Sequence, residues 1–167
     1  MLNALLHLEI RLATLEEAED CREIIHKAYE AGRKLMSRDP KVLLKPGKDF
    51  VDLAKKKRLY VIIYENNLIG TFTLTLKDPP AILQYFALVP KCQNRGWGSN
   101  ILLWIENYVR ENEFDVIRLE TYEKWVQTNR FYQQRGYQHI DSFTKENETI
   151  FIWEKVVASI EPIESEM

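Results

Sequence analysis

The sequence contains little of several residue types that mark specialised proteins. It has 2 cysteines among 167 residues, and these, Cys21 and Cys92, stand far apart in the chain. Two unspaced thiols fit a reducing cytoplasm better than a disulfide framework. The histidines His7, His26 and His139 lack the spacing of metal ligands, so no metal site is predicted.

Charge and hydropathy exclude two further classes of protein. The net charge of −2 gives no basis for broad, non-specific binding to nucleic acid. No apolar run approaches the roughly 20 residues that span a bilayer. The first ten residues have no basic n-region and no small-residue cleavage site, and they lead directly into a strand pattern. We therefore expect a soluble cytoplasmic protein that binds neither nucleic acid nor membrane.

Helical and strand-like patterns alternate along the chain. Apolar runs typical of strands cover residues 6–13, 59–67, 68–77, 81–89, 114–122, 137–143 and 149–157. Helical periodicity covers residues 13–31, 47–58, 98–112 and 125–136. With no internal repeat and no interior linker, these patterns predict one α+β or α/β domain over residues 1–157 with a mixed sheet. Residues 158–167 are acidic and contain a proline, so we expect a flexible tail.

Short local signals mark the ends of some elements. Thr14 and Glu17 have the spacing of a capping box at a helix start. Asn66 and Asn67 are placed to form the turn of a β-hairpin. The polar, irregular segment 32–46 is expected to contain a mobile loop.

Glycine is scarce, yet two of the 6 glycines stand in the stretch PKCQNRGWGSN, residues 90–100. A strand pattern precedes this stretch and a helical pattern follows it. Such a turn suits a phosphate group, because unpaired N–H groups at the helix start face the anion and glycine has no Cβ to block it. Asn94 tolerates a left-handed backbone, and Arg95 adds positive charge. A plain strand-to-helix connection explains the glycine spacing equally well, and both interpretations stay open at this point.

Two other nucleotide-binding motifs do not fit this turn. The dinucleotide fingerprint needs a third glycine where the chain has Ile101, and the P-loop needs Gly-Lys-Ser/Thr after its spacer. The fingerprint also follows the first strand of a parallel unit, whereas three hairpin-like strand patterns precede this turn. The sequence therefore argues against both motifs.

The stretch ALVPKCQNRGWGSNILLWIENYV, residues 87–109, resembles the acyl-CoA-binding motif of the GNAT superfamily of N-acyltransferases. In that motif a strand, a proline-containing link and a Gln/Arg-x-x-Gly-x-Gly/Ala turn open a long helix. Gln93, Gly96 and Gly98 occupy the corresponding positions. The chain departs from the usual motif at Cys92 and Asn94, where neither change removes a backbone donor.

A second stretch extends the resemblance. TNRFYQQRGY, residues 128–137, resembles the late helix of the family, in which an Asn leads to an aromatic-Tyr pair and a Gly-aromatic pair closes. Asn129, Phe131, Tyr132, Gly136 and Tyr137 stand at these places. The predicted order of helices and strands is also that of the family, so the resemblance covers nearly the whole chain.

The resemblance implies a fold and a co-substrate. The fold would be a single GNAT-like domain of α+β (α/β) class, with a mixed central sheet of about six to seven strands flanked by about four helices. The co-substrate would be acetyl-CoA, with no metal. The implied binding residues are Ala87, Leu88, Val89, Gln93, Asn94, Arg95, Gly96, Trp97, Gly98, Ser99 and Asn129.

The resemblance also implies roles in catalysis. Tyr132 would protonate or hydrogen-bond the departing CoA thiolate. The acceptor amine, with a pKa near ~10.4, must lose a proton before it attacks. Many relatives place a Glu for this purpose where the chain has Gln84 and Tyr85, and Gln cannot act as a base. Glu120 on the neighbouring strand is a candidate that would act through water, and a plain surface carboxylate is the alternative.

The acceptor site implied by the resemblance lies in loops around the sheet. It would include residues 29–46, Trp125 and the turn at residues 144–148. Trp125, Tyr122 and Tyr85 are candidates for an aromatic wall, although aromatic side chains near a sheet are usually part of the core.

The sequence leaves two functions open. The first is transfer of an acetyl group from acetyl-CoA to the amine of a small molecule or peptide. The second is an acyl-CoA-binding sensor or regulatory module that has lost catalysis, which the absent carboxylate at Gln84 favours. The last strand, TIFIWEKVV, is a candidate for pairing or packing in a homodimer.

Overall fold

A computed structural model describes residues 7–158 of the chain. Of the predicted acidic tail, residues 158–167, only Ala158 lies within the described residues; its N–H donates to Asp115 O at 3.3 Å. The elements follow one another in the order β1 (Leu8–Leu12), α2 (Ala18–Arg33), η1 (Lys41–Leu44), α3 (Gly47–Lys55), β2 (Leu59–Tyr64), β3 (Asn67–Thr75), β4 (Ala81–Leu88), η2 (Pro90–Cys92), α4 (Trp97–Glu111), β5 (Val116–Tyr122), α5 (Val126–Gln134), β6 (Gln138–Lys145) and β7 (Glu148–Val156).

The strands form one mixed sheet of 7 strands in the order β1-β2-β3-β4-β5-β7-β6. Neighbouring strands are antiparallel except β4 and β5, which are parallel. This arrangement confirms the predicted single α+β domain with a mixed sheet. Strand β7 lies between β5 and β6, so both of its edges are hydrogen-bonded within the sheet over residues 150–154. A homodimer, which stays a prediction, would therefore have to use another edge or a face of β7.

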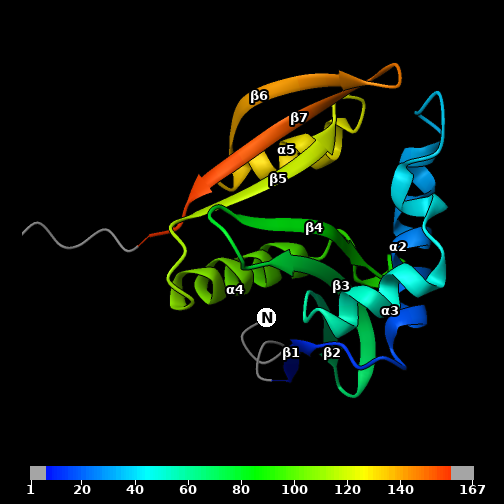
Figure 1. The fold of residues 1–167 in the computed structure, drawn as a ribbon, viewed down its shortest axis with the longest axis vertical. Helices are drawn as coiled ribbons and strands as arrows, with labels where there is room; N and C mark the ends of the chain where they lie inside the picture. The colour runs from blue at the N-terminus through cyan, green and yellow to red at the C-terminus, as the bar shows by residue number, and fades with distance from the viewer. Residues whose placement is uncertain (1–6, 159–167) are drawn as a thin grey trace, which may run out of the picture.

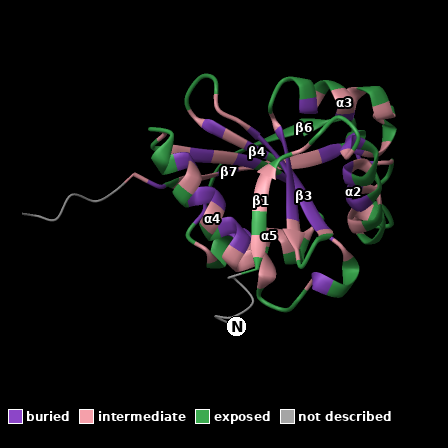
Figure 2. Ribbon diagram, turned by 90° about the horizontal axis from the view of Figure 1, so that it is seen from below, coloured by how far each residue is buried: buried purple, intermediate pink, exposed green. Residues whose placement is uncertain are grey.

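The core has two parts, one on each face of the sheet. Alternating residues of β2 divide between them: Leu59 and Val61 pack against α2 and α3, whereas Tyr60 and Ile62 pack against α4. This follows from the period of two along a strand. The α4 face also buries residues of β5, β7 and α5, and it holds the larger cluster. In Figure 2, the buried residues run along the central strands and the inner sides of the helices.

The sheet separates between β4 and β5. These strands pair only at their beginnings, where Ala81 lies opposite Ile117 and Ile82 opposite Arg118. Beyond this point they diverge, and Figure 1 shows the gap widening towards α2. A bulge in β4 contributes to the divergence: the register with β3 shifts between Thr71 and Thr73, and Tyr85, in the bulge, has a φ of +53°.

Some local predictions are confirmed and one is wrong by a residue. The two hydrogen bonds of the predicted capping box form, because Thr14 N–H donates to Glu17 Oε1 at 2.9 Å and Glu17 N–H donates to Thr14 Oγ1 at 3.3 Å. They close the turn directly before α2, which begins at Ala18 with Glu17 as its N-cap residue. The β2–β3 hairpin turns on Glu65 and Asn66, not on Asn66 and Asn67. Both central residues have positive φ, as a tight hairpin turn requires, and Tyr64 pairs with Asn67.

The segment predicted to be irregular, residues 32–46, includes η1, whose Val42 is buried in the core on the α2 face. Among residues 7–158, no helix combines the length and the apolar character needed to cross a membrane.

Candidate active site

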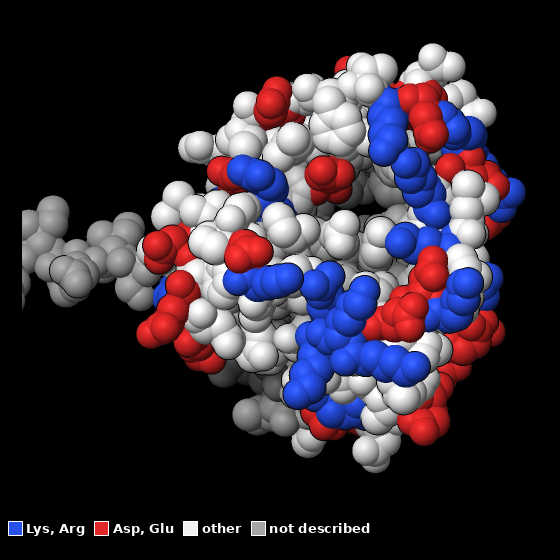
Figure 3. Space-filling model, in the orientation of Figure 1, with Lys and Arg blue, Asp and Glu red and all other residues white. Residues whose placement is uncertain are grey.

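The gap between β4 and β5 opens into a cavity of about 1450 Å³. Residues at the start of α4 line one end, and the loop after α2 and the β6–β7 hairpin line the other. Figure 3 shows the hollow on the molecular surface. The volume exceeds the ~300–1,000 Å³ that is usual for one drug-sized ligand, so the cavity has room for a long co-substrate and an acceptor together.

The α4 end of the cavity offers unpaired backbone donors. Gly96, just before α4, has a φ of +79°, and Asn94 has a φ of +59°, so both adopt the left-handed conformation expected of the turn. The first hydrogen bond of the helix runs from Asn100 N–H to Gly96 O at 3.4 Å. The N–H groups of Trp97, Gly98 and Ser99 therefore have no acceptor within the helix. Together with the helix dipole, they form an anion-binding end.

Arg135, at the end of α5, adds a cation beside this helix start. Its guanidinium donates to Ser99 Oγ, with an Nε–Oγ distance of 2.8 Å, and lies 3.8 Å from the centre of the Phe131 ring. A Cβ on Gly98 would lie 3.3 Å from Phe131 Cε2, so the second glycine of the turn permits close packing of α4 against α5. The sequence did not distinguish Arg135 from an ordinary basic residue at a helix C-terminus.

The edge of β4 facing the gap has no strand partner beyond Ile82. Near its end, Leu88 O accepts a hydrogen bond from Gln93 Nε2 at 2.9 Å, whereas Val89 N–H donates to Ile69 O of β3 at 2.8 Å. Gln93 thus fixes the turn to the strand. An unpaired strand edge that lines a cavity can bind an extended ligand that carries amides.

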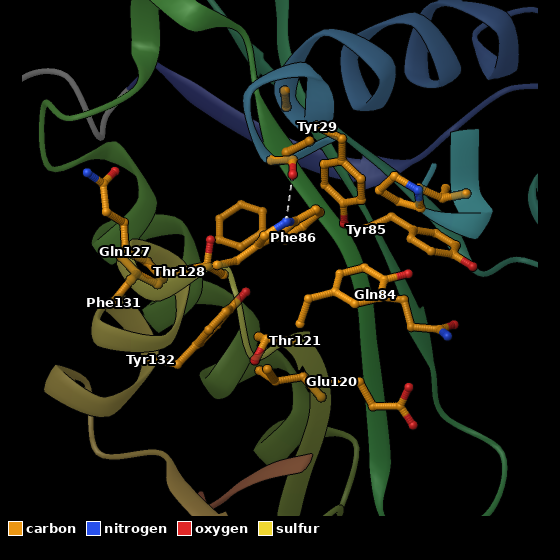
Figure 4. A pocket seen from close by; sticks show the side chains of 18 of the residues that line it. Tyr29, Gln84, Tyr85, Phe86, Glu120, Thr121, Gln127, Thr128, Phe131 and Tyr132 are labelled. Atoms are coloured by element: carbon orange, nitrogen blue, oxygen red, sulfur yellow. Dashed lines mark hydrogen bonds between the residues drawn. The ribbon is translucent and has the colours of Figure 1, made fainter. Parts of the chain in front are cut away.

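Tyr132 of α5 lines the cavity. Its side chain is 7 % exposed, and among the described residues its hydroxyl has no hydrogen-bond partner. Burial raises the pKa of Tyr132 well above its ordinary value, and the nearby charge of Arg135 only partly opposes this effect. Figure 4 shows the ring and its hydroxyl reaching into the cavity. The hydroxyl is therefore protonated and free to donate.

The sequence-predicted residues divide into two groups. Those that line the cavity are Ala87, Leu88, Gln93, Asn94, Gly96, Gly98, Ser99 and Tyr132. Those outside its lining are Val89, Arg95, Trp97 and Asn129. The Trp97 ring packs against Tyr64 of β2, with 4.8 Å between ring centres. Arg95 is exposed in the turn.

Asn129 holds the turn between β5 and α5. Its Nδ2 donates to Tyr122 O at 3.2 Å and to Glu123 O at 3.1 Å, and its Oδ1 accepts from Thr121 Oγ1. The side chain therefore bonds to the adjacent strand, which places the Tyr132 helix relative to β5. Contact between Asn129 and a cofactor stays a prediction.

Aromatic side chains enclose the other end of the cavity. Trp125 Nε1 donates to Gly32 O of α2 at 3.1 Å, across 93 positions of sequence. The Trp125 ring meets Tyr29 and Tyr122 edge-on, with ring centres 5.1 and 4.9 Å away. Burial raises the pKa values of Tyr29, Tyr85 and Tyr122, so these hydroxyls keep their protons. The residues proposed as an aromatic wall thus lie together in the cavity lining.

A buried carboxylate anchors the loops at this end. Glu148, at the start of β7, is 3 % exposed. Its Oε1 accepts from Ser37 N at 2.9 Å and from Ser37 Oγ at 2.7 Å, and Lys124 Nζ lies 3.2 Å away. These donors lower the pKa of Glu148, with the Ser37 N–H as the largest cause. The carboxylate is therefore charged and committed to joining the loop after α2, the β5–α5 loop and β7.

Gln84 and Glu120 line the cavity from β4 and β5. Both side chains are exposed, and Figure 4 shows them on the same side of the cavity. Glu120 alternates along β5 with Leu119 and Thr121, which are buried on the opposite face. The carboxylate thus faces the same side of the sheet as α2, where the aromatic end of the cavity lies.

Known proteins share this architecture. The sequence model of the acetyltransferase (GNAT) family matches residues 18–137. The S-(2-succino)cysteine N-acetyltransferase of Bacillus subtilis (strain 168) is 28% identical over 142 residues, which cover 76% of this chain and 82% of that protein.

Two solved structures are similar at the level of the fold. The PaiA N-acetyltransferase of Thermoplasma acidophilum, in complex with coenzyme A, aligns with a TM-score of 0.75 and 18% identity over 89% of this chain and 98% of that chain. A GNAT-family acetyltransferase of Streptococcus agalactiae aligns with a TM-score of 0.73 and 18% identity over 89% and 95%.

Proposed function

The chain belongs to the acetyltransferase (GNAT) family, and from this premise we propose that it transfers an acetyl group from acetyl-CoA to the primary amine of a small molecule or peptide. The observation that carries the proposal is the position of the Tyr132 hydroxyl. It stands without a hydrogen-bond partner among the described residues, in a cavity that joins an anion-binding helix start to an aromatic chamber.

The residues at the α4 end fit the chemistry of acetyl-CoA. The free N–H groups of Trp97, Gly98 and Ser99 suit a pyrophosphate, and Arg135 places a cation beside them. The unpaired edge of β4 suits a chain that carries amides. When bound, acetyl-CoA supplies an acetyl group activated as a thioester.

Tyr132 acts on the leaving sulfur. A free thiol titrates near ~8.5 and a free phenol near ~10, so full proton transfer from a phenol to a thiolate is already uphill. Burial raises the pKa of Tyr132 further, which makes that transfer less favourable. The hydroxyl therefore stabilises the departing thiolate by donating a hydrogen bond to it.

Glu120 is the candidate for receiving the proton of the amine. The position at which relatives carry a carboxylate holds Gln84, and Glu120 lines the cavity from the next strand. The carboxylate would take the proton directly or through one water, and the acetylated amine would leave as a neutral amide.

The acceptor is proposed to be a small molecule. The B. subtilis relative has a name that specifies S-(2-succino)cysteine, a small amine, as its substrate. The chamber between α2, the β5–α5 loop and the β6–β7 hairpin is closed on one side by the Trp125–Gly32 hydrogen bond, which favours a compact acceptor over a folded protein.

An assay of thiol release tests the proposal. We expect acetyl-CoA to raise the midpoint of thermal unfolding, whereas NAD and ATP at the same concentration do not. With acetyl-CoA present, at least one amine in a panel of amino acids, small diamines and short peptides should produce CoA thiol together with an N-acetyl product detected by mass spectrometry. If the protein binds acetyl-CoA but releases no CoA thiol with any amine, the proposed enzymatic function is contradicted and the acyl-CoA-binding sensor is supported.

A further inference from the structure

The mouth of the aromatic chamber is ringed by basic side chains. Arg38, Lys41, Lys124 and Lys145 all line the cavity, and they come from the loop after α2, the start of η1, the β5–α5 loop and the end of β6. Figure 3 shows Lys and Arg side chains gathered along the rim of the hollow. They are brought together only by the fold, because Lys41 and Lys145 are more than 100 positions apart.

Two of these cations have carboxylate partners. Arg38 Nη2 lies 2.9 Å from Glu146 Oε2, and Lys124 Nζ lies 3.2 Å from the buried Glu148 Oε1. A third carboxylate of this rim, Asp39, is 2.6 Å from Arg33 Nε. Asp39, Glu146 and Glu148 are therefore already paired with cations, and the fourth carboxylate of the lining, Glu120, is the candidate base.

Lys41 and Lys145 remain without a carboxylate. Within residues 7–158, neither forms an ion pair, and both line the same mouth of the cavity, where Lys145 acts directly on Lys41. The proximity of Lys145 is the largest cause of a lowered pKa at Lys41, although Glu146 opposes it. Two ammonium groups that face each other repel unless an anion lies between them. Such a pair is a site for an anionic group.

The lysine pair is connected to the chamber. The backbone of Lys41 lies beside the Tyr122 hydroxyl, where it opposes the rise in the pKa of that group. The chamber presents the uncharged side chains of Tyr29, Trp125, Phe143 and Ile150, and the Glu120 carboxylate lines the same cavity from β5. An acceptor seated here would contact apolar and aromatic surface within a cavity that is lined by both the lysine pair and Tyr132.

We infer that the acceptor is a small amine that carries a carboxylate remote from the amine, and that Lys41 and Lys145 bind this carboxylate. The inference rests on the proposed function, because it assigns the substrate class of the same site. It also excludes polyamines as the preferred acceptors, since a second ammonium group would meet the lysine pair.

Matched acceptors test the inference. S-carboxymethyl-L-cysteine and S-carbamoylmethyl-L-cysteine have nearly the same shape and differ by one carboxylate, as do L-glutamate and L-glutamine. At saturating acetyl-CoA, we expect kcat/KM for thiol release to be at least tenfold higher for the acid of a pair than for its amide. Raising the ionic strength should lower kcat/KM for the acid more than for the amide.

Variants test whether Lys41 and Lys145 cause the preference for acids over amides. The double variant Lys41→Gln/Lys145→Gln should raise KM for the acids about tenfold and leave KM for acetyl-CoA and kcat/KM for the amides within about twofold. The variant Lys48→Gln, on an exposed face of α3 outside the cavity lining, is the matched control and should behave as wild type. Because Lys41 and Lys145 are exposed, the thermal unfolding midpoints of these variants should agree.

The outcomes separate the inference from the proposed function. Three results would overturn the inference and leave the proposed acetyltransferase function intact. They are equal turnover of acids and amides, a preference for polyamines, and an unchanged KM for the acids in the double variant. Absence of release with every amine, including neutral and cationic ones, would overturn the proposed function, and the inference with it.

Discussion

At the scale of single residues, the most unusual conformation belongs to Tyr85. Its φ of +53° is rare for a residue with a Cβ, and it occurs where β4 turns away from β5. A left-handed conformation costs an L-residue roughly 1–2 kcal/mol. The packing of Tyr85 against the core on the α2 face offsets this cost.

At position 85, glycine should therefore be a more stabilising replacement than alanine, which is the reverse of the usual order within a strand. We expect Tyr85→Gly to have a higher free energy of unfolding than Tyr85→Ala, by about 1 kcal/mol, because glycine has no Cβ to strain. At the neighbouring Gln84, whose φ is ordinary, Ala should be the more stable replacement by about 0.5–1 kcal/mol. Urea unfolding of the four variants measures both differences. If Tyr85→Ala were more stable than Tyr85→Gly, the left-handed backbone of residue 85 in the bulge would be contradicted.

Gly32 is the second residue whose identity the fold dictates. A Cβ at this position would lie 2.5 Å from Trp125 Cε2, on the face of α2 that receives the Trp125 hydrogen bond. Glycine within a helix otherwise costs about 1 kcal/mol relative to alanine. Close approach of the indole is thus the reason for a glycine here.

The effect of Gly32→Ala should depend on Trp125. In the wild-type background we expect it to lower the free energy of unfolding by roughly 1–3 kcal/mol, because the added methyl group displaces the indole. In a Trp125→Ala background the same change should raise it by up to about 1 kcal/mol, because only the helix propensity remains. A double-mutant cycle from urea unfolding measures the difference. The same effect in both backgrounds would rule out the contact.

At the scale of elements, the junction of β1 and α2 is held by an ion pair and a capping box. Arg11 Nη1 and Nη2 donate to Glu17 Oε1 and Oε2 at 2.7 and 3.0 Å, and Thr14 N–H donates to the same carboxylate. The hydrogen bond from Arg11 is the largest of the causes that lower the pKa of Glu17 to about 2. The carboxyl therefore has a higher proton affinity in the unfolded chain than in the folded one.

This difference predicts how the junction responds to acid. A lowered folded pKa gives stabilisation that is complete above the ordinary pKa near ~4.3 and is lost as pH falls from there towards 2. Glu17→Gln should thus lower the free energy of unfolding by about 0.5–1 kcal/mol at pH 7, a value reduced for the partial exposure of Arg11. The difference from wild type should shrink between pH 4.5 and 2.

Urea unfolding at a series of pH values measures this difference. Glu16→Gln, at an exposed neighbouring position, provides the control and should remain close to wild type at every pH. A deficit of Glu17→Gln that stays constant down to pH 3 would show that its cause is not the charge of Glu17.

The elements themselves were largely predictable from the sequence, because local chemistry specifies them. Thr14 and Glu17 stabilise the start of α2 through bonds within four residues of each other. The hairpin turn was misplaced by one residue because Asn66 and Asn67 both favour turns, and the register depends on pairing between Tyr64 and Asn67. The bulge at Tyr85 gave no sequence signal, since tyrosine there reads as an ordinary strand residue.

At the scale of the whole molecule, the site is the place where one sheet separates into two parts. The prediction of Tyr132 and the α4 turn came from contiguous motifs that resemble those of a family, and these residues do line one cavity. Arg135 beside Ser99 and Lys41 beside Lys145 depend on contacts between distant segments. No local pattern encodes such contacts, so the resemblance indicated the segments of the acceptor end, residues 29–46, Trp125 and 144–148, but not which of their charged side chains meet.

The central claim is that Tyr132 assists the departure of CoA within this cavity. The most direct measurement compares wild type with Tyr132→Phe for acetyl-CoA affinity by calorimetry and for amine-dependent thiol release at saturating substrates. We predict unchanged affinity and a kcat reduced by roughly 10²-fold, the lower end of the range for loss of a positioned proton donor. A Tyr132→Phe variant that binds acetyl-CoA and releases thiol at the wild-type rate would contradict the account.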